Sequence, residues 1–187
     1  MSAARLFVLT CHPATPCAAV TAVTAALERS AGHWHLRYAL SGDIARLRVP
    51  QPAPHPGFTD GLWQHTCFEA FVGREDDPAY REFNFSPSGD WAAYAFSAER
   101  VRDAAAAPLP APRIACAREA HRLTLDAWVP GAALPPAHGD TPPPLGLTAV
   151  VETLDGALSC WALHHPARQP DFHHRAGWTA RLAVSAD

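Results

Sequence analysis

Residues 58–96 read FTDGLWQHTCFEAFVGREDDPAYREFNFSPSGDWAAYAF, and the fold of the whole chain is interpreted from this stretch. Three runs rich in aromatic and apolar residues, 66–72, 80–86 and 90–97, are separated by two loops of Asp, Pro, Ser and Gly residues. Short runs bounded by turn-forming residues are typical of β-strands. The stretch therefore predicts three consecutive strands of an antiparallel sheet.

Alternation within the first two runs predicts which side chains face the core, because successive side chains of a strand point to opposite faces of the sheet. In the first run an apolar row (Phe68, Ala70 and Val72) faces the core, which places Glu69 on the other face. In the second run Phe83 and Phe85 form the core row. That assignment leaves Glu82 and Asn84 on the same outer face as Glu69.

The length of the second hairpin loop decides where Trp91 points. A four-residue loop, 87–90, puts Trp91 on the face of Glu82 and Asn84, and it groups Phe83 and Phe85 with the two aromatic residues that follow Trp91. A three-residue loop would instead place Trp91 in the core against Phe85. Because a slip of one residue moves every side chain to the other face, the grouping of aromatic residues favours the four-residue loop.

The predicted outer face has the composition of a small-ligand site. Glu69, Glu82 and Asn84 offer hydrogen bonds, and Trp91 offers an aromatic surface beside small alanines. A flat polar ligand such as a sugar suits this combination, because the aromatic ring covers C–H groups while the polar groups take hydroxyls. The alternative is purely structural: the carboxylates pair with Arg residues and Trp91 packs beneath a loop.

A His-rich loop, 164–173, is expected to form one wall of this site. Its candidate ligand-binding residues are His165, Asp171 and His173. The same loop is a weaker candidate for a metal site, because its His spacing matches no defined zinc motif.

Further strand-like runs fill the rest of the chain, and no run predicts a long helix. Residues 18–28 mix helix-favouring Ala with strand-favouring Val and Thr, and we assign them to a strand because the sequence downstream is β. The other expected strands are 5–9, 33–40, 44–49, 113–119, 121–129, a hairpin over 145–163, and 178–184. About ten strands at this spacing predict an all-β fold, an antiparallel sandwich or barrel forming one domain over residues 1–187.

The composition of the chain argues against several classes of function. Apolar residues make up 48% and charged residues 18% of 187 residues, which is typical of a globular protein. A net charge of −3 without a basic run argues against a nucleic-acid partner. No segment approaches the roughly 18 uninterrupted apolar residues of a membrane span. Five Cys residues without a C-x-x-C pair fit scattered thiols in a reducing compartment, so we expect a cytoplasmic protein.

The chain resembles a known family at 62–96 and 160–173. The segments LWQHTCFEAFVG (62–73) and YREFNFSPSGDWAAYAF (80–96), with W-A-L-x-H-P and P-D-F-H later, are similar to DOMON-like proteins of the small bacterial group related to family 9 carbohydrate-binding modules. The resemblance implies an immunoglobulin-like β-sandwich that binds a sugar or haem at one sheet face. The function expected is therefore a non-catalytic ligand-binding module, with a sugar as the ligand.

Two other functions remain open at the level of sequence. The related cytochrome domains hold haem with a Met and a His, and the only Met here is Met1, so a haem would need two His ligands. Alternatively, Glu69 and Glu82 could serve a weak glycoside hydrolase, which uses two carboxyl groups. The sequence does not indicate an oligomeric state.

Overall fold

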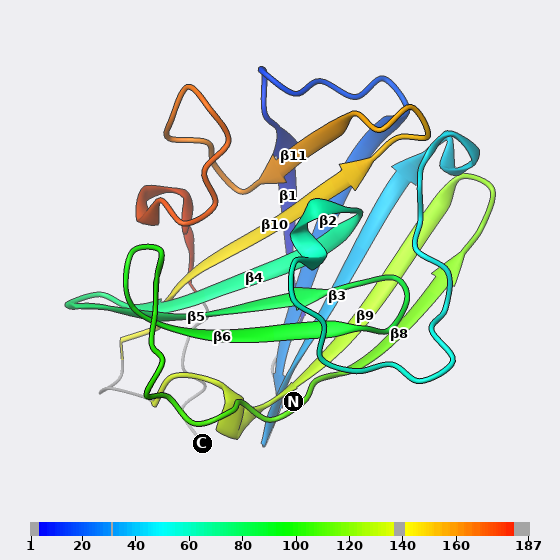
Figure 1. Ribbon diagram of the computed structural model, residues 1–187. Helices are drawn as coiled ribbons and strands as arrows, with labels where there is room; N and C mark the ends of the chain where they lie inside the picture. Colours follow the sequence, from blue (N-terminus) through cyan, green and yellow to red (C-terminus); the bar gives the residue numbers. More distant parts are fainter. Residues whose placement is uncertain (1–3, 31, 137–140, 182–187) are drawn as a thin grey trace.

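The computed structural model describes residues 4–30, 32–136 and 141–181, and these form an all-β, antiparallel structure of twelve strands (Figure 1). The strands are β1 Arg5–Cys11, β2 Val20–Ser30, β3 His33–Gly42, β4 Cys67–Arg74, β5 Asp77–Phe85, β6 Trp91–Ala98, β7 Val101–Arg102, β8 Arg113–Arg118, β9 Arg122–Pro130, β10 Pro144–Glu152, β11 Leu158–Ala162 and β12 Ala180–Arg181. Four short 3-10 helices lie between them: η1 Ile44–Arg46, η2 Leu62–Gln64, η3 Gly131–Ala133 and η4 Arg175–Gly177. In the described ranges no helix is long and apolar enough to cross a membrane.

The strands follow one continuous path, β7-β6-β5-β4-β10-β11-β1-β2-β3-β9-β8, with β12 beside β10. Strand β1 joins the two halves of this path. Its first part, from Arg5 to Leu9, pairs with β2, and its last two residues, Thr10 and Cys11, pair with β11. The sheet therefore curls so that its two halves face each other, as Figure 1 shows, rather than forming two separate sheets as the predicted sandwich would.

The main core fills the space between the two halves. In β3 the alternating residues Trp34, Leu36, Tyr38 and Leu40 point inward, and so do alternating residues of β9. They meet the apolar row of β4, where the rings of Tyr38 and Phe68 lie 5.0 Å apart. The Tyr38 hydroxyl donates a 2.6 Å hydrogen bond to the Glu69 carbonyl oxygen, so a polar contact also joins the two halves.

A second apolar cluster lies on the outer face of β4, β5 and β6. It consists of Phe71, Tyr80, Ala92, Tyr94, Phe96 and Trp178, with Leu62 and Phe172 packed against it. Strands β4 and β5 are therefore buried on both faces, whereas the alternation of their residues predicts one buried face and one open face. Trp178 comes from the segment after η4, and it lies against the sheet where Gly73 and Gly146 leave room for its ring.

Most strand predictions are confirmed, including the assignment of 18–28 to a strand, which is β2. Two are wrong. Residues 44–49 form η1 and a single bridge at Leu47 instead of a strand, because the chain turns there to cross the end of the curled sheet. The last predicted strand, 178–184, is reduced to β12, and its residues beyond Arg181 lie outside the described ranges.

Candidate functional site

Trp91 does not lie on the face of Glu82 and Asn84, so the predicted position of its side chain is wrong. In the pairing of β5 with β6, Trp91 is opposite Phe85, and Asn84 is opposite Ala92. Residues paired across two strands point to the same face. Trp91 thus leaves the sheet on the side of Phe85, where its ring meets Phe58 edge-on at 5.6 Å.

The reason for this register is the turn after β5. The loop has three residues, 87–89, and the main chain of Ser86 closes it with two hydrogen bonds. The Ser86 amide donates to the Asp90 carbonyl, and the Ser86 carbonyl accepts from the Gly89 amide, both at 3.0 Å. Gly89 has a φ of +91°, the left-handed conformation with which such three-residue hairpin loops end. The Ser88 hydroxyl contacts the Ser86 hydroxyl and the Asp90 carboxylate, each at 2.8 Å, and holds the turn.

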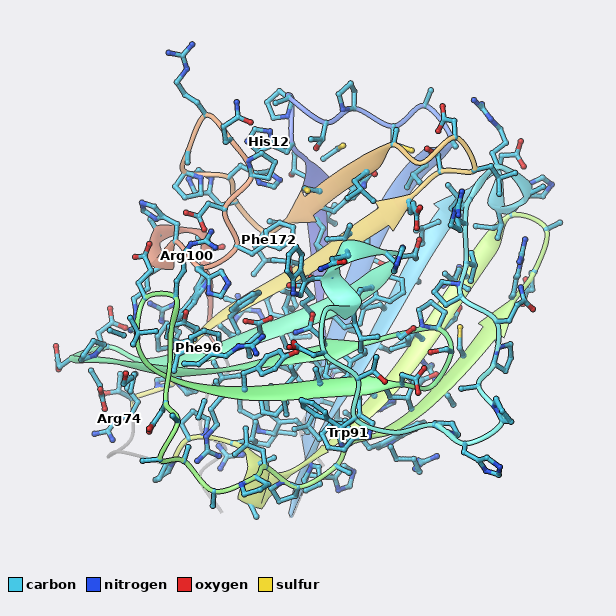
Figure 2. All side chains as sticks on the ribbon, in the orientation of Figure 1. His12, Arg74, Trp91, Phe96, Arg100 and Phe172 are labelled. Atoms are coloured by element: carbon cyan, nitrogen blue, oxygen red, sulfur yellow. The ribbon has the colours of Figure 1, made fainter. Side chains whose placement is uncertain are left out.

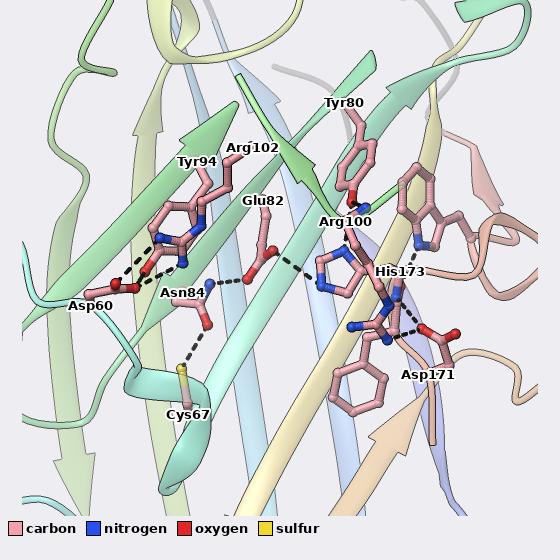
Figure 3. A network of polar contacts seen from close by, with 12 residues as sticks. Asp60, Cys67, Tyr80, Glu82, Asn84, Tyr94, Arg100, Arg102, Asp171 and His173 are labelled. Carbon is pink, nitrogen blue, oxygen red and sulfur yellow. Dashed lines mark hydrogen bonds and ion pairs between the residues drawn. The ribbon is translucent and has the colours of Figure 1, made fainter. Parts of the chain in front are cut away.

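The other predicted polar residues of the sheet do lie together on its outer face. Glu69 of β4 is paired with Asn84 of β5, and Glu82 follows two residues away on the same face. The Asn84 side-chain amide donates a 2.6 Å hydrogen bond to Glu82, and its oxygen lies 3.6 Å from the Cys67 sulfur (Figure 3). All four side chains are buried. We call Glu69, Glu82, Asn84 and Thr148, which lies opposite Glu69 on β10, the polar row.

Two buried atoms of the polar row have no hydrogen-bond partner among the described residues. They are Glu69 Oε1 and Thr148 Oγ1, which belong to residues directly opposite each other on β4 and β10. Burying a polar atom without a partner typically costs about 1–3 kcal/mol. Such atoms are uncommon in folded proteins, and this pair marks a point where the sheet face offers hydrogen bonds that the fold itself does not use.

The two carboxyl groups of the polar row hold their protons more tightly than usual. Burial raises the pKa of Glu82 to about 7, although the hydrogen bond from Asn84 opposes the rise. Burial, followed by the charge of Glu82, raises the pKa of Glu69 well above its usual range. The Thr148 hydroxyl opposes that shift, but it does not meet the carboxyl with hydrogen-bond geometry. At neutral pH Glu82 is therefore partly ionised.

An exposed ion pair borders the polar row on the side of β6 and β7. The Arg102 guanidinium donates hydrogen bonds of 2.9 and 3.3 Å to the two oxygens of Asp60 and lies 3.9 Å from the centre of the Tyr94 ring. The Tyr94 hydroxyl also donates to Asp60. These two contacts lower the pKa of Asp60 to about 2, the Arg102 contact having the larger effect.

A second ion pair borders the row on the opposite side, where Asp171 accepts a 2.7 Å hydrogen bond from Arg100 (Figure 3). Next to it, the Tyr80 hydroxyl accepts the Arg100 backbone amide and lies 2.6 Å from His173 Nδ1. Burial and the nearby Arg100 charge lower the pKa of His173 to about 4, so the ring is neutral at pH 7. The Tyr80 hydroxyl already accepts from Arg100, which leaves its own proton free for Nδ1 and favours the tautomer with the ring proton on Nε2, 3.7 Å from Glu82.

The predicted wall, 164–173, contributes to this surface in part. His173 and Asp171 lie beside the polar row, and Phe172 packs against the second apolar cluster. His165 does not join them in any described contact. Its Nε2 lies 2.8 Å from the Thr10 carbonyl, and its ring packs edge-on against buried His12. Within the described residues, no group of three or more His, Cys, Asp or Glu side chains is arranged to hold a metal ion.

Several residues of this site were not identified from the sequence. They are Asp60, Trp63, Tyr80, Tyr94, Arg100, Arg102 and Thr148. The alternation of side chains in the run 80–86 could have identified Tyr80, because Tyr80 lies two residues from Glu82 and shares its face. Trp63 lies on η2, which contacts β4 and β5, and its side chain is 49% exposed. Asp60 and Arg102 meet only because two loops converge, and no local pattern indicates that.

No protein-family model matches this chain, and no curated protein matches it either. Among solved structures, the fold is similar to that of a protein from Bacteroides uniformis that is named as a candidate carbohydrate-binding protein. The two are 14% identical with a TM-score of 0.67, and the match covers 93% of this chain and 84% of that one. At this level of identity the comparison shows a shared fold.

Proposed function

We propose that this protein is a non-catalytic carbohydrate-binding module and that the sugar binds over the polar row. The observation that carries the proposal is the pair of unpartnered buried atoms, Glu69 Oε1 and Thr148 Oγ1, within a row that also contains a carboxyl with a pKa of about 7. Buried polar groups without partners do not stabilise a core, but they can form hydrogen bonds with the hydroxyl groups of a polyol. The name of the Bacteroides uniformis structure agrees with this choice of ligand.

The surroundings of the row supply the other parts of a sugar site. Two exposed ion pairs, Asp60–Arg102 and Arg100–Asp171, lie on either side of Glu82 and offer charged hydrogen-bonding groups at the rim. Trp63 offers an open indole for stacking on the C–H face of a sugar ring, the role that the sequence analysis gave to Trp91. Glu82 is only 4% exposed, so a sugar reaches it by displacing η2 or the segment around His173.

The family assignment belongs to the same proposal. A DOMON-like module related to family 9 carbohydrate-binding modules, with an immunoglobulin-like arrangement of strands, is supported by the E-x-N-x-S-P-x-G-x-W segment at 82–91. In the structure this segment has a clear physical role. Its Glu and Asn form part of the polar row, its Pro and Gly are the first and last residues of the three-residue turn, and its Ser closes that turn.

The module is proposed as non-catalytic because of the placement of its carboxyl groups. The two carboxyl groups of a glycosidase flank the glycosidic bond that is cleaved. Glu69 and Glu82 project from the same face of the sheet, so both approach a bound sugar from one side. Absence of reducing-sugar release from bound oligosaccharides is the expected outcome, and turnover that disappears in Glu82→Gln would contradict it.

Calorimetric titration with a panel of mono- and oligosaccharides tests the proposal. We expect at least one sugar to bind. We expect Glu82→Gln and Glu69→Gln each to weaken its binding roughly tenfold, since each replaces a carboxyl oxygen with an amide group that cannot accept a hydrogen bond. Glu28→Gln is the matched control, because Glu28 lies on β2 in the other half of the sheet. Equal losses in all three variants, or no binding by any sugar, would contradict the proposal.

A further inference from the structure

A cavity of about 580 Å³ lies on the other side of β6 from the polar row. Trp91, Ala93 and Ala95, which alternate along β6, form its floor. Phe58 closes one end, and the loop that follows β7, ending at Leu109, forms the opposite wall. Figure 2 shows Trp91 at this edge of the sheet, well away from Phe172 of the second apolar cluster. The cavity therefore opens mainly on the other face of β6, and it shares Tyr94 and Arg102 with the border of the proposed sugar site.

The backbone holds the two aromatic residues of the cavity in place. The segment around Phe58 runs beside the start of β6, where the Trp91 amide donates to the Gly57 carbonyl and the Thr59 amide donates to the Trp91 carbonyl, at 3.0 and 2.9 Å. The rings of Phe58 and Trp91 meet at an angle of 81°. The Phe58 ring therefore stands perpendicular to Trp91 and bounds one side of an apolar slot, whose floor of Trp91 and alanine methyl groups suits a planar ring.

The charged side chains that line the cavity are already engaged. Arg102 is hydrogen-bonded to both carboxylate oxygens of Asp60. Asp103 accepts a 3.0 Å hydrogen bond from the Ala105 amide of its own loop. The remaining lining consists of aromatic, Ala, Pro and Leu residues. Apart from the exposed carboxylate of Asp103, the cavity thus presents apolar surface and a neutralised Arg102, so it favours an uncharged ligand.

The volume of the cavity limits the size of its occupant. Small-molecule sites typically enclose about 300–1,000 Å³ and are mostly apolar with few polar groups. We propose that this cavity is a binding site for a small, uncharged, planar ring compound of one or two fused rings. The ligand stacks on Trp91 and lies against the methyl groups of Ala93 and Ala95. The floor of this site and the polar row of the proposed carbohydrate site lie on opposite faces of β6, and the two sites meet at Tyr94 and Arg102.

Indole is a suitable probe, because it is planar, uncharged and has two fused rings. We expect saturable changes in the ¹H–¹⁵N spectrum at the amides of Ala93 and Ala95 and at the Trp91 indole N–H as indole is added. Ala95→Leu fills the floor of the cavity and is expected to weaken indole binding roughly tenfold. Ala26→Leu is the matched control: it makes the same change on β2, in the other half of the sheet, and is expected to bind indole as the natural protein does.

Phe58→Ala provides a second variant that does not disturb the core, since Phe58 is 55% exposed. It is expected to weaken indole binding at least threefold, because one face of the slot is lost. Saturable binding that weakens in Ala95→Leu or in Phe58→Ala, but not in Ala26→Leu, supports the site. The proposal is overturned if indole causes no saturable change at these groups up to its solubility limit, or if neither cavity variant differs from the control.

Discussion

Trp91 lies opposite Phe85 across β5 and β6, and this pairing separates the one tryptophan of the 80–96 segment from the carboxyl groups beside it in sequence. The main-chain groups of Trp91 are hydrogen-bonded outward, to Gly57 and Thr59, and not to β5. Phe85 and Trp91 therefore form a non-hydrogen-bonded pair, the closer of the two kinds of pair in an antiparallel sheet. As a result, the polar row lies on the outer face of the sheet, and the apolar surface around Trp91 lies on the opposite face.

This pairing predicts a strong nuclear Overhauser effect between the Hα protons of Phe85 and Trp91, because the Hα protons of such a pair point toward each other. A ¹³C-edited spectrum of labelled protein would show it. A strong Hα–Hα contact between Ser86 and Trp91 instead would contradict the register and restore the four-residue loop.

The raised pKa of Glu82 predicts a pH-dependent effect of Glu82→Gln on stability. The folded protein binds the Glu82 proton more tightly than the unfolded chain does, with a pKa of about 7 against 4.5. The ionisation of Glu82 therefore does not lower the free energy of unfolding below about pH 4.5, and it lowers it by the full amount above about pH 7. Gln cannot ionise, so the variant gains on the natural protein as the pH rises, by roughly 3 kcal/mol in total.

Urea denaturation of both proteins between pH 5 and pH 8 measures this difference. Glu28→Gln serves as control and should show no comparable trend with pH. A difference between Glu82→Gln and the natural protein that is constant over this range would show that the Glu82 carboxyl is solvated.

The lowered pKa of His173 predicts that its ring titrates with a midpoint near pH 4. The unfolded chain takes up this proton at about pH 6.5, so the contribution of His173 to stability is lost as the pH falls from about 6.5 to 4. The ¹H–¹⁵N signals of the imidazole, followed against pH, report the midpoint and the tautomer together. A midpoint near 6.5 would show that the His173 ring is solvated and does not pack against Tyr80 in solution.

Gly146→Ala is expected to destabilise the protein by about 1–3 kcal/mol, because the added carbon would lie 2.5 Å from Trp178 Cδ1. Displacing that ring would also break its 2.8 Å hydrogen bond to the Phe172 carbonyl. Gly57→Ala is the control, since a Cβ there would meet nothing within 4 Å. Thermal denaturation of the two variants compares them; similar midpoints would mean that Trp178 does not lie on the sheet.

Alternation of side chains was enough to predict the strands and the polar row. Phe68 and Phe85 are core residues and Glu69 and Asn84 face outward because each pair obeys a period of two, which is a local property. The all-β fold and most strand positions follow from the same property. The curl of the sheet does not, because it depends on β1 pairing with strands from opposite ends of the chain.

The position of Trp91 was mispredicted because the reasoning assumed one core. Grouping aromatic residues on one side is sound for a sheet with a single buried face. Here Tyr94 and Phe96 are buried on the outer face, beneath Trp178 and Phe172 from a distant segment. The sequence of the turn indicates the correct loop length, because Gly89 suits the left-handed last position of a three-residue loop.

The central claim, that a sugar binds over the polar row, is tested most directly by locating the bound sugar in the ¹H–¹⁵N spectrum. With the tightest-binding sugar of the panel, we predict saturable shifts of the Trp63 indole N–H and of the Asn84 side-chain amide. The indole of Trp128, on the outer face of the opposite half of the sheet, should not move. Shifts confined to Trp91 or Trp128, with Asn84 and Trp63 unchanged, would contradict the account.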